Sequence, residues 1–530
     1  MPAAVLAGRA ARRLVRRLCR LPVRVVAGPE PEQAPDPVRT TEMRLLGLHP
    51  GLVRHGDRLA GIRDDLLSWQ ARDAGLAEVA EVLDGAGIRY ALVPDPGYRH
   101  RLAIRPGDRR AVLDAFAEAC ADQPVYFELL GHGKELGLTL ADGLLAAVAA
   151  TEAVRADPEP GQQEEPGESG EPEIERVKGL RVFRPTVTTG RTLYYGADHG
   201  CDLEFWDADA EGSGAVAAIA ETPYGWWLPS METSGPVRIA GRDIPVLGLL
   251  AGTFPKDIDF PVDAVITWVD DSGPGWCRRR AAALATAGPE LRLDAADHRY
   301  RNRDELRYCL RSIAAYAPWV RRIFLVTDDQ VPPWLDTAHP GLTVVPHREL
   351  FADPAVLPVF NSHAIETQLH RIPGLAEHFL YFNDDLFLGR PVQPHSFFLG
   401  SGLPRIVRNS RTVPPGERTE GDSVYTAAQK NARAAVFRSA ADLPPVTLAL
   451  YAAHATGQAV DARLEHFYAV TDRAEQLGRL ADLLASRWAD TFCLADGDGP
   501  ELPAEEQSRV LAEFLRDYYP VASPYELSPP

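Results

Sequence analysis

The sequence predicts an α/β protein whose catalytic domain is built around a mostly parallel sheet. Three short apolar segments each end in acidic residues: VDAVITWVDD, RRIFLVTDD and EHFLYFNDD. Helices are expected between them, at residues 304–317 and 362–371. Strands that alternate with helices form parallel sheets covered on both faces, and ligands bind beyond the carboxyl ends of such strands. The polar residues that end these strands are therefore expected to mark a ligand site.

The length of 530 residues favours roughly two to four domains. Residues 40–150 alternate helical and strand-like segments, which predicts a small α/β domain. Residues 157–176 are acidic, rich in Pro and Gly and almost free of apolar side chains, so a disordered linker is expected there. Aromatic and β-branched residues between turns make residues 179–255 a β-rich subdomain or an elaboration of the next domain. Residues 259–526 are expected to form the catalytic domain.

The composition limits the class of protein. A formal net charge of -18 argues against a general nucleic-acid binder, which needs a basic face. Six cysteines without a C-x-x-C pair argue against a disulfide framework or a zinc ribbon and favour a cytoplasmic protein. No run of about 18 apolar residues predicts a membrane span. Residues 1–26, with arginines at helical spacing, are either a basic amphipathic leader lying peripherally on the anionic inner face of the membrane or a solvated extension.

An acidic turn is the first candidate for chemistry. Asn383, Asp384 and Asp385 directly follow a strand-like apolar segment. Adjacent carboxylates repel each other unless a cation offsets their charge, and Mg²⁺ or Mn²⁺ prefers oxygen ligands and often bridges carboxylates to substrate phosphates. The alternative interpretation is that one aspartate caps the turn while the other is solvated.

Arginines precede the second strand of the series. Arg301 and Arg303 lie in a loop before a predicted helix, and guanidinium groups bind phosphate oxygens through two hydrogen bonds. Arg307, one turn into that helix, is expected instead to pair with Asp304 and Glu305 on a solvated face.

A second group of polar residues lies in the segment NSHAIETQLHR. Asn361 and Ser362 stand where a helix is expected to begin, with Ser362 as its N-cap in the structural interpretation. Glu366 and His370 are four residues apart and would share a helical face, where they would bind a metal or position an acceptor hydroxyl.

Together these segments resemble the Stealth family of sugar-phosphate transferases. The resemblance is strong over residues 259–394, from DAVITWVDD through HFLYFNDDLFLGRPV. The segment AAQKNARAAV, with Asn431 and Arg433, and the segment LYAAH, ending in His454, are similar to a third conserved region. This chain lacks the proline that the family usually shows soon after that histidine. RWADTFCLADG, with Asp496, is similar to a fourth region.

The resemblance implies a reaction. The donor would be a nucleotide-activated sugar, typically a UDP-sugar, and a hydroxyl of a saccharide acceptor would attack its β-phosphorus. A nucleoside monophosphate would leave, and a sugar phosphodiester of a cell-surface polysaccharide would remain. Such a transfer depends more on positioning and charge neutralisation than on covalent help from the protein.

The resemblance also implies roles for residues. The expected metal ligands are Asp384, Asp385 and Asp496. The expected catalytic residues are Arg301, which steadies the diphosphate, His454 as general base with His370 as its rival, and Glu366. The expected substrate-binding residues are Trp268, Asp270, Arg303, Asn361, Ser362, Asn431 and Arg433.

Two other functions fit the same sequence. One is a metal-dependent glycosyltransferase of the same fold, which would release a nucleoside diphosphate. The other is a catalytically inactive relative that binds glycan or scaffolds an assembly complex.

Overall fold

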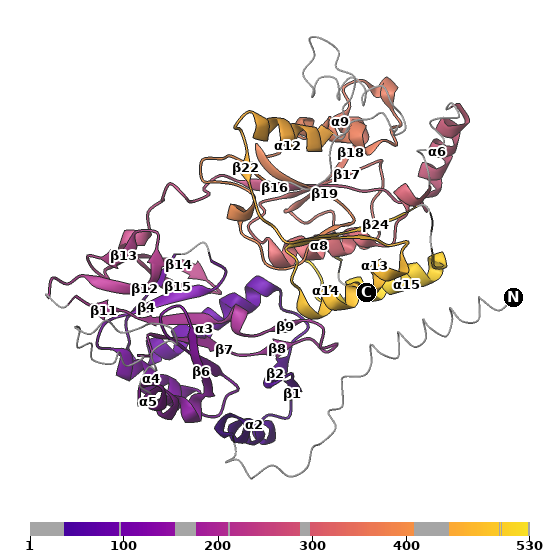
Figure 1. Cartoon of the computed structure of the whole chain (residues 1–530). Helices are drawn as coiled ribbons and strands as arrows, with labels where there is room; N and C mark the ends of the chain where they lie inside the picture. Colours follow the sequence, from indigo (N-terminus) through magenta and orange to yellow (C-terminus); the bar gives the residue numbers. More distant parts are fainter. Residues whose placement is uncertain are drawn as a thin grey trace, which may run out of the picture.

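The computed structural model shows two units, an N-terminal one and a C-terminal one, that lie against each other (Figure 1). The structure describes residues 36–94, 97–153, 176–209, 212–286, 297–407, 445–497, 499 and 501–527. The leader predicted at residues 1–26 lies outside them, as does all of the predicted linker except residue 176. None of the helices in the described residues combines the length and apolar character that crossing a membrane requires.

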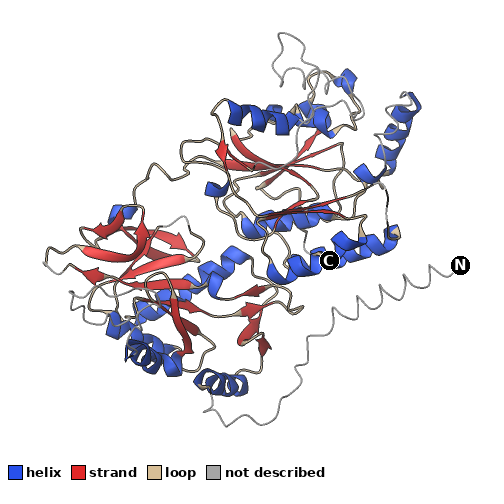
Figure 2. Cartoon of the chain, in the orientation of Figure 1, coloured by secondary structure: helices blue, strands red, loops and turns tan. Residues whose placement is uncertain are grey.

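The N-terminal unit is organised by an eight-stranded mixed sheet (Figure 2). Its strands, in spatial order, are β14 (Thr233–Ile239), β15 (Arg242–Leu247), β3 (Tyr90–Val93), β4 (His100–Ile104), β10 (Cys201–Phe205), β7 (Gly179–Phe183), β5 (Tyr126–Leu130) and β6 (Glu135–Leu140). In this order, pairs of strands from residues 179–255 alternate with pairs of strands from residues 40–150. The two segments therefore share one sheet, an arrangement that no local pattern in the sequence indicates.

Helices and small sheets complete this unit. Leu76, Val79 and Leu83 of α3 pack with Phe116 of α4 on one face of the large sheet, and all four are buried. The helices are α2 (Pro37–Leu48), α3 (Ser68–Gly85), α4 (Arg109–Ala119) and α5 (Leu144–Ala153). The remaining strands are β1 (Leu52–His55), β2 (Arg58–Ile62), β8 (Thr186–Val187), β9 (Tyr194–Tyr195), β11 (Asp207–Ala208), β12 (Val216–Thr222) and β13 (Gly225–Leu228).

The C-terminal unit contains the predicted parallel sheet. Its order is β18 (Leu342–Pro346), β17 (Ile323–Thr327), β16 (Val262–Thr267) and β19 (His378–Asn383), and all three pairings are parallel. Alternate residues face opposite sides. Ala264 and Ile266 pack toward α8 (Glu305–Tyr316), whereas Val265 packs toward α9 (His347–Leu350) and α10 (Ser362–Glu366). The apolar stripe of Leu306, Leu310 and Ile313 predicted for α8 is buried.

A second sheet packs against α8 through β20 (Leu386–Leu388). It has the order β20, β24 (Thr491–Ala495) and β23 (His466–Val470). The chain passes from β19 in the first sheet to β20 in the second through only two residues, Asp384 and Asp385. The remaining elements are α6 (Pro274–Thr286), β21 (Arg405–Ile406), α12 (Pro445–Ala455), β22 (Val460–Asp461), α13 (Ala474–Gly478), α14 (Leu480–Ser486) and α15 (Ala504–Tyr518).

The helix predicted over residues 362–371 is wrong in two respects. It is broken into α10 and a separate 3₁₀ turn at Leu369–Arg371. The N-cap is Asn361, whose side chain accepts from the backbone N–H of His363, and Ser362 is the first helical residue. Pro373 disfavours helical geometry at the residue before it, so the segment ends there. Glu366 and His370 therefore belong to different elements, with Glu366 at the end of α10 and His370 in the 3₁₀ turn.

The two units are joined by packing and by one arginine. Leu67, Leu193 and Tyr195 of the N-terminal unit belong to the same buried cluster as the core around α8. The Arg487 guanidinium donates to the carbonyl of Thr192 at 3.0 Å, to the carbonyl of Tyr518 at 2.9 Å and to the hydroxyl of Tyr316 at 3.0 Å. It also lies 4.1 Å from the centre of the Tyr518 ring.

We expect Arg487→Met to lower the free energy of unfolding by about 2 kcal/mol, because two carbonyls lose a charged donor. Urea denaturation followed by circular dichroism measures the change. Arg509→Ala is the matched control, since its exposed pair with Glu513 on α15 contributes little. Equal stability of the two variants would show that the arginine does not hold the units together.

Candidate active site at the junction of two sheets

A cavity of about 550 Å³ opens where strands of both sheets end. Trp268 follows β16, Asp328 follows β17 and His347 follows β18, and all three line it. The acidic turn after β19 lines it as well, and Asp496 reaches it from the end of β24. The sequence analysis expected polar residues to gather at the carboxyl ends of parallel strands, and the structure confirms this for the C-terminal unit.

The acidic turn is held rigidly between the sheets. The backbone carbonyl of Asp385 accepts from the N–H of Leu494 at 3.0 Å, and Leu386 pairs with Cys493 in register. Burial raises the pKa of Asp385 to about 6. Burial, the charge of Asp385 and that of Glu305 raise the pKa of Asp384 well above its usual range. The fold thus places two carboxylates where their ionised forms are disfavoured.

The two carboxylates fit a divalent cation. Oδ1 of Asp385 is buried and has no hydrogen-bond partner among the described residues. No group of three or more His, Cys, Asp or Glu side chains converges to hold a metal within the part of the chain that the structure describes. Mg²⁺ is commonly bound by one or two carboxylates, with waters and substrate phosphates as its other ligands, so the pair matches that pattern.

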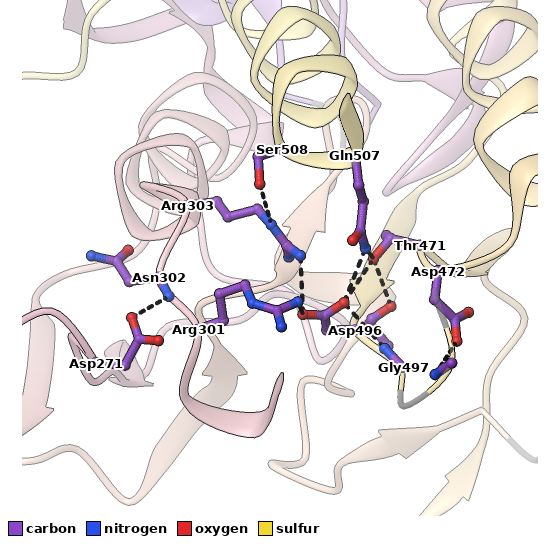
Figure 3. Close-up of polar contacts among 12 residues, drawn as sticks. Asp271, Arg301, Asn302, Arg303, Thr471, Asp472, Asp496, Gly497, Gln507 and Ser508 are labelled. Atoms are coloured by element: carbon purple, nitrogen blue, oxygen red, sulfur yellow. Dashed lines mark hydrogen bonds and ion pairs between the residues drawn. The ribbon is translucent and has the colours of Figure 1, made fainter. Parts of the chain in front are cut away.

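Asp496 accepts hydrogen bonds from two arginines that line the same cavity (Figure 3). Its Oδ2 accepts from Arg301 and, at 3.0 Å, from Nη2 of Arg303. Its Oδ1 accepts from Gln507 of α15 at 3.0 Å, and Nε of Arg303 donates to Ser508 at 3.1 Å. In this arrangement Asp496 positions the two guanidinium groups, and its predicted role as a metal ligand stays a prediction.

Glu305 is a cavity residue that the sequence analysis assigned to a surface ion pair. Arg307 does pair with Asp304 at 2.9 Å, as predicted, and lies over the Trp334 ring. Glu305 instead turns inward, where it accepts from the backbone N–H of Arg303, and burial raises its pKa to about 7. Its place in the first turn of α8 was visible in the sequence, but its burial was not.

His347 is a second residue that the sequence analysis missed. It is buried, lines the cavity and has an Nδ1 without a hydrogen-bond partner among the described residues. Burial lowers its pKa to about 4 despite the opposing charge of Asp328, so the imidazole is neutral at pH 7. Its position directly after a strand, in VVPHREL, is the signal that could have identified it.

The residues expected to bind the nucleotide differ in their placement. Trp268 is buried against the cavity, and its Nε1 has no hydrogen-bond partner among the described residues. Asp270 does not line the cavity. Its carboxylate accepts from the backbone N–H and the hydroxyl of Ser272, which shapes the loop after β16. The next residue, Asp271, accepts from the N–H of Asn302 and so ties that loop to the arginine loop.

The predicted acid–base and acceptor residues are more scattered. Ser362 lines the cavity, and Asn361 is buried as the cap of α10. Glu366 lies close enough to Tyr381 for its charge to affect that hydroxyl. His370 is exposed and does not line the cavity.

His454 also lies apart from the cavity lining. It lies in the last turn of α12, and its Nε2 is 3.0 Å from a carboxylate oxygen of Asp461. Asn431 and Arg433 lie outside the described residues, so their predicted contacts with substrate stay predictions.

Comparison with protein families gives two matches. The Stealth protein CR2 model, conserved region 2, matches residues 299–406, and the CR4 model, conserved region 4, matches residues 481–530. The first match contains both arginines of the cavity and the acidic turn, and the second contains Asp496. The matched regions therefore meet at the cavity.

Curated relatives align with most of the chain. Exopolysaccharide phosphotransferase SCO6023 of Streptomyces coelicolor is 34% identical over 90% of this chain and 86% of its own length. Exopolysaccharide phosphotransferase CpsY of Mycobacterium tuberculosis is 31% identical over 90% of this chain and 93% of its own. Exopolysaccharide phosphotransferase SCO2592 of S. coelicolor is 39% identical over 92% of this chain, which spans about half of that protein's length (54%).

We expect Asp385→Asn to stabilise the metal-free protein at neutral pH. Because the pKa of Asp385 is raised to about 6, the carboxyl contributes stability that is present below its unfolded pKa of about 4 and lost as the pH rises through 6. The asparagine has no charge to bury. Its advantage in unfolding free energy should therefore grow between about pH 4 and 6 and reach on the order of 1–2 kcal/mol.

Urea denaturation in EDTA across that pH range measures the advantage. Asp270→Asn is the control, because hydrogen bonds from Ser272 outweigh burial and lower the pKa of Asp270, so its loss should destabilise the protein at neutral pH. A difference between the Asp385 variant and the parent that does not change with pH would contradict the prediction.

Proposed function

Because the chain belongs to the Stealth family of exopolysaccharide phosphotransferases, we propose that it transfers a sugar 1-phosphate from a nucleotide-sugar donor to a saccharide hydroxyl. One observation carries the proposal. A single cavity is lined by two guanidinium groups that converge on Asp496, here called the arginine wall, and by two adjacent carboxylates next to them, here called the acidic wall. Phosphoryl transfer requires this combination of positioning and charge neutralisation.

The arginine wall would bind the donor diphosphate. Arg301 is partly exposed to the cavity, whereas Arg303 is buried behind it and fixed by Asp496 and Ser508. A guanidinium that a carboxylate already orients loses little further conformational freedom when it binds a phosphate, so binding costs less entropy. Arg301 would therefore contact the diphosphate directly. Arg303 would contribute positive charge to the electrostatic field there and keep the local geometry fixed.

The acidic wall would hold Mg²⁺ or Mn²⁺ through Asp384 and Asp385. When bound, the cation supplies charge neutralisation at the phosphates and polarises the bond to the leaving group. The protein's contribution is to keep the two carboxylates fixed between β19 and β20. Trp268 and neutral His347 also line the cavity, and each has a ring nitrogen without a hydrogen-bond partner among the described residues, which would face the uncharged part of the nucleotide.

The geometry favours Glu305 over the two predicted histidines as the general base. Neither His454 nor His370 lines the cavity. Glu305 does line it, and its pKa of about 7 suits proton transfer at neutral pH. The pH dependence of turnover in Glu305→Gln and His454→Gln would separate these assignments.

The test is product analysis with a panel of nucleotide sugars, oligosaccharide acceptors and Mg²⁺. We expect acceptor-dependent release of nucleoside monophosphate, together with a phosphodiester product that ³¹P NMR detects. EDTA should abolish release, and Asp384→Asn should lower it about a hundredfold or more. Release of nucleoside diphosphate would instead identify a glycosyltransferase. Glycan binding without turnover of any donor would identify a scaffold.

We expect Arg301→Ala to lower kcat/KM for the donor by about a hundredfold, because a charged contact to the diphosphate is lost. Arg307→Ala is the matched control, since this neighbouring arginine faces Asp304 and Trp334 and does not line the cavity. Steady-state kinetics with varied donor concentration distinguish the two. Similar losses in both variants would remove Arg301 from the proposed diphosphate site.

A further inference from the structure

The N-terminal unit contains a cavity of about 910 Å³, larger than the one at the candidate active site. It lies on the face of the eight-stranded sheet opposite α3 and α4. Leu102, Leu180 and Leu203 turn toward those helices, so the intervening residues of β4, β7 and β10 turn toward the cavity.

These intervening residues form a row of alternating charge across four strands. Asp202 of β10 is in register with Arg101 of β4 on one side and with Arg181 of β7 on the other. Arg181 is in turn in register with Glu128 of β5, and its guanidinium donates to Glu128 at 2.9 Å and to Asp202 at 2.8 Å. Opposite charges in register stabilise a sheet, and they also give the cavity a floor of planar polar groups.

The floor of the cavity is connected to the β12–β13 strand pair through side-chain hydrogen bonds. Glu204, buried beneath the cavity, accepts from Nε of Arg101 and from the Trp206 indole at 2.8 Å. The other nitrogens of Arg101 donate to the backbone carbonyls of Ala220 and Glu221 in β12 at 3.2 Å. Arg101 thus anchors the β12–β13 hairpin along one side, so the cavity exists before any ligand binds.

An exposed tryptophan lies at the cavity. Trp226 of β13 lines it and is 50% exposed. Trp227, the next residue in the strand, is 57% exposed but points to the other side and does not line the cavity. A large exposed aromatic side chain beside a preformed polar cavity is typical of a ligand site rather than of a solvated surface.

The charges of the lining indicate the class of ligand. The ionised side chains that line the cavity balance in formal charge: Arg99, Arg101, Lys134 and Arg181 against Glu135, Asp202, Glu204 and Glu221. A phosphate site would have an excess of cations, and a metal site would lack arginines. Carboxylates and guanidinium groups together accept from and donate to neighbouring hydroxyls, and an indole ring packs against the C–H face of a sugar.

We propose that this cavity binds a neutral saccharide segment of the polysaccharide acceptor. The identification of that polysaccharide as the acceptor rests on the proposed function. In Figure 1 the β12–β13 hairpin lies at the left edge of the N-terminal unit, whereas the strands that carry the candidate active site belong to the C-terminal unit. The segment held here is therefore distant from the reacting end. Binding at a second, remote position raises the effective concentration of a polymer at the active site without any contact to the reacting atoms.

Affinity electrophoresis in gels that contain neutral glucan, galactan or mannan tests the binding directly, without any need for turnover. We expect at least one of these to retard the parent protein and Trp226→Ala to weaken the retardation by about tenfold, whereas Trp226→Phe keeps most of it. Trp227→Ala is the matched control and should behave as the parent. Equal thermal unfolding of all variants confirms that they are folded.

Three results would overturn the proposal: no retardation of the parent, an equal loss in the Trp226 and Trp227 variants, or retardation by acidic polysaccharide alone that salt removes. A kinetic arm separates it from the proposed function. If the chain is a transferase, Trp226→Ala should raise KM for a polymeric acceptor while leaving release of nucleoside monophosphate with a short acceptor unchanged. Failure of all nucleotide release would refute the transferase and leave the gel result standing.

Discussion

Two aspartates form the turn that connects the parallel sheet to the second sheet of the C-terminal unit, and the candidate site depends on this constraint. A two-residue turn leaves Asp384 and Asp385 no room to separate, and β20 pairs with β24 immediately afterwards. Burial raises the pKa of both groups, and the charge of Asp385 raises the pKa of Asp384 further. The surrounding sheets must therefore stabilise a turn whose ionised form is disfavoured.

The arginine loop that lines the same cavity carries the opposite charge. Two arginines in one loop would repel each other, and Asp496 with Gln507 and Ser508 holds them together. These partners come from β24 and α15, about two hundred residues further along the chain. The cavity thus places positively charged groups beside the acidic turn. Both are oriented before substrate binds, which is the condition for efficient electrostatic stabilisation.

The N-terminal unit also contributes to the packing of the C-terminal unit. Its residues complete the core around α8, and the Arg487 guanidinium bonds both units. Because α8 also carries Glu305 into the cavity, the packing of the N-terminal unit supports one wall of the site. The charged row on its large sheet faces away from this joint and leaves a second cavity free for a ligand.

Local patterns in the sequence determined the parallel strands of the C-terminal unit, the amphipathic α8, the acidic turn and the arginine loop. Alternation, helical spacing and strand-end polarity are properties of neighbouring residues, so they can be read without the fold. Burial and partner choice depend on segments far apart in the chain.

Only the tertiary structure could decide that residues 40–150 and 179–255 share a sheet, that Asp496 binds two arginines, and that Glu305 and His347 face the cavity. Only the tertiary structure shows that α10 ends before His370 and that His454 lies beside Asp461, away from the cavity lining. Helix ends and side-chain neighbours are set by packing rather than by the spacing of residues in the sequence.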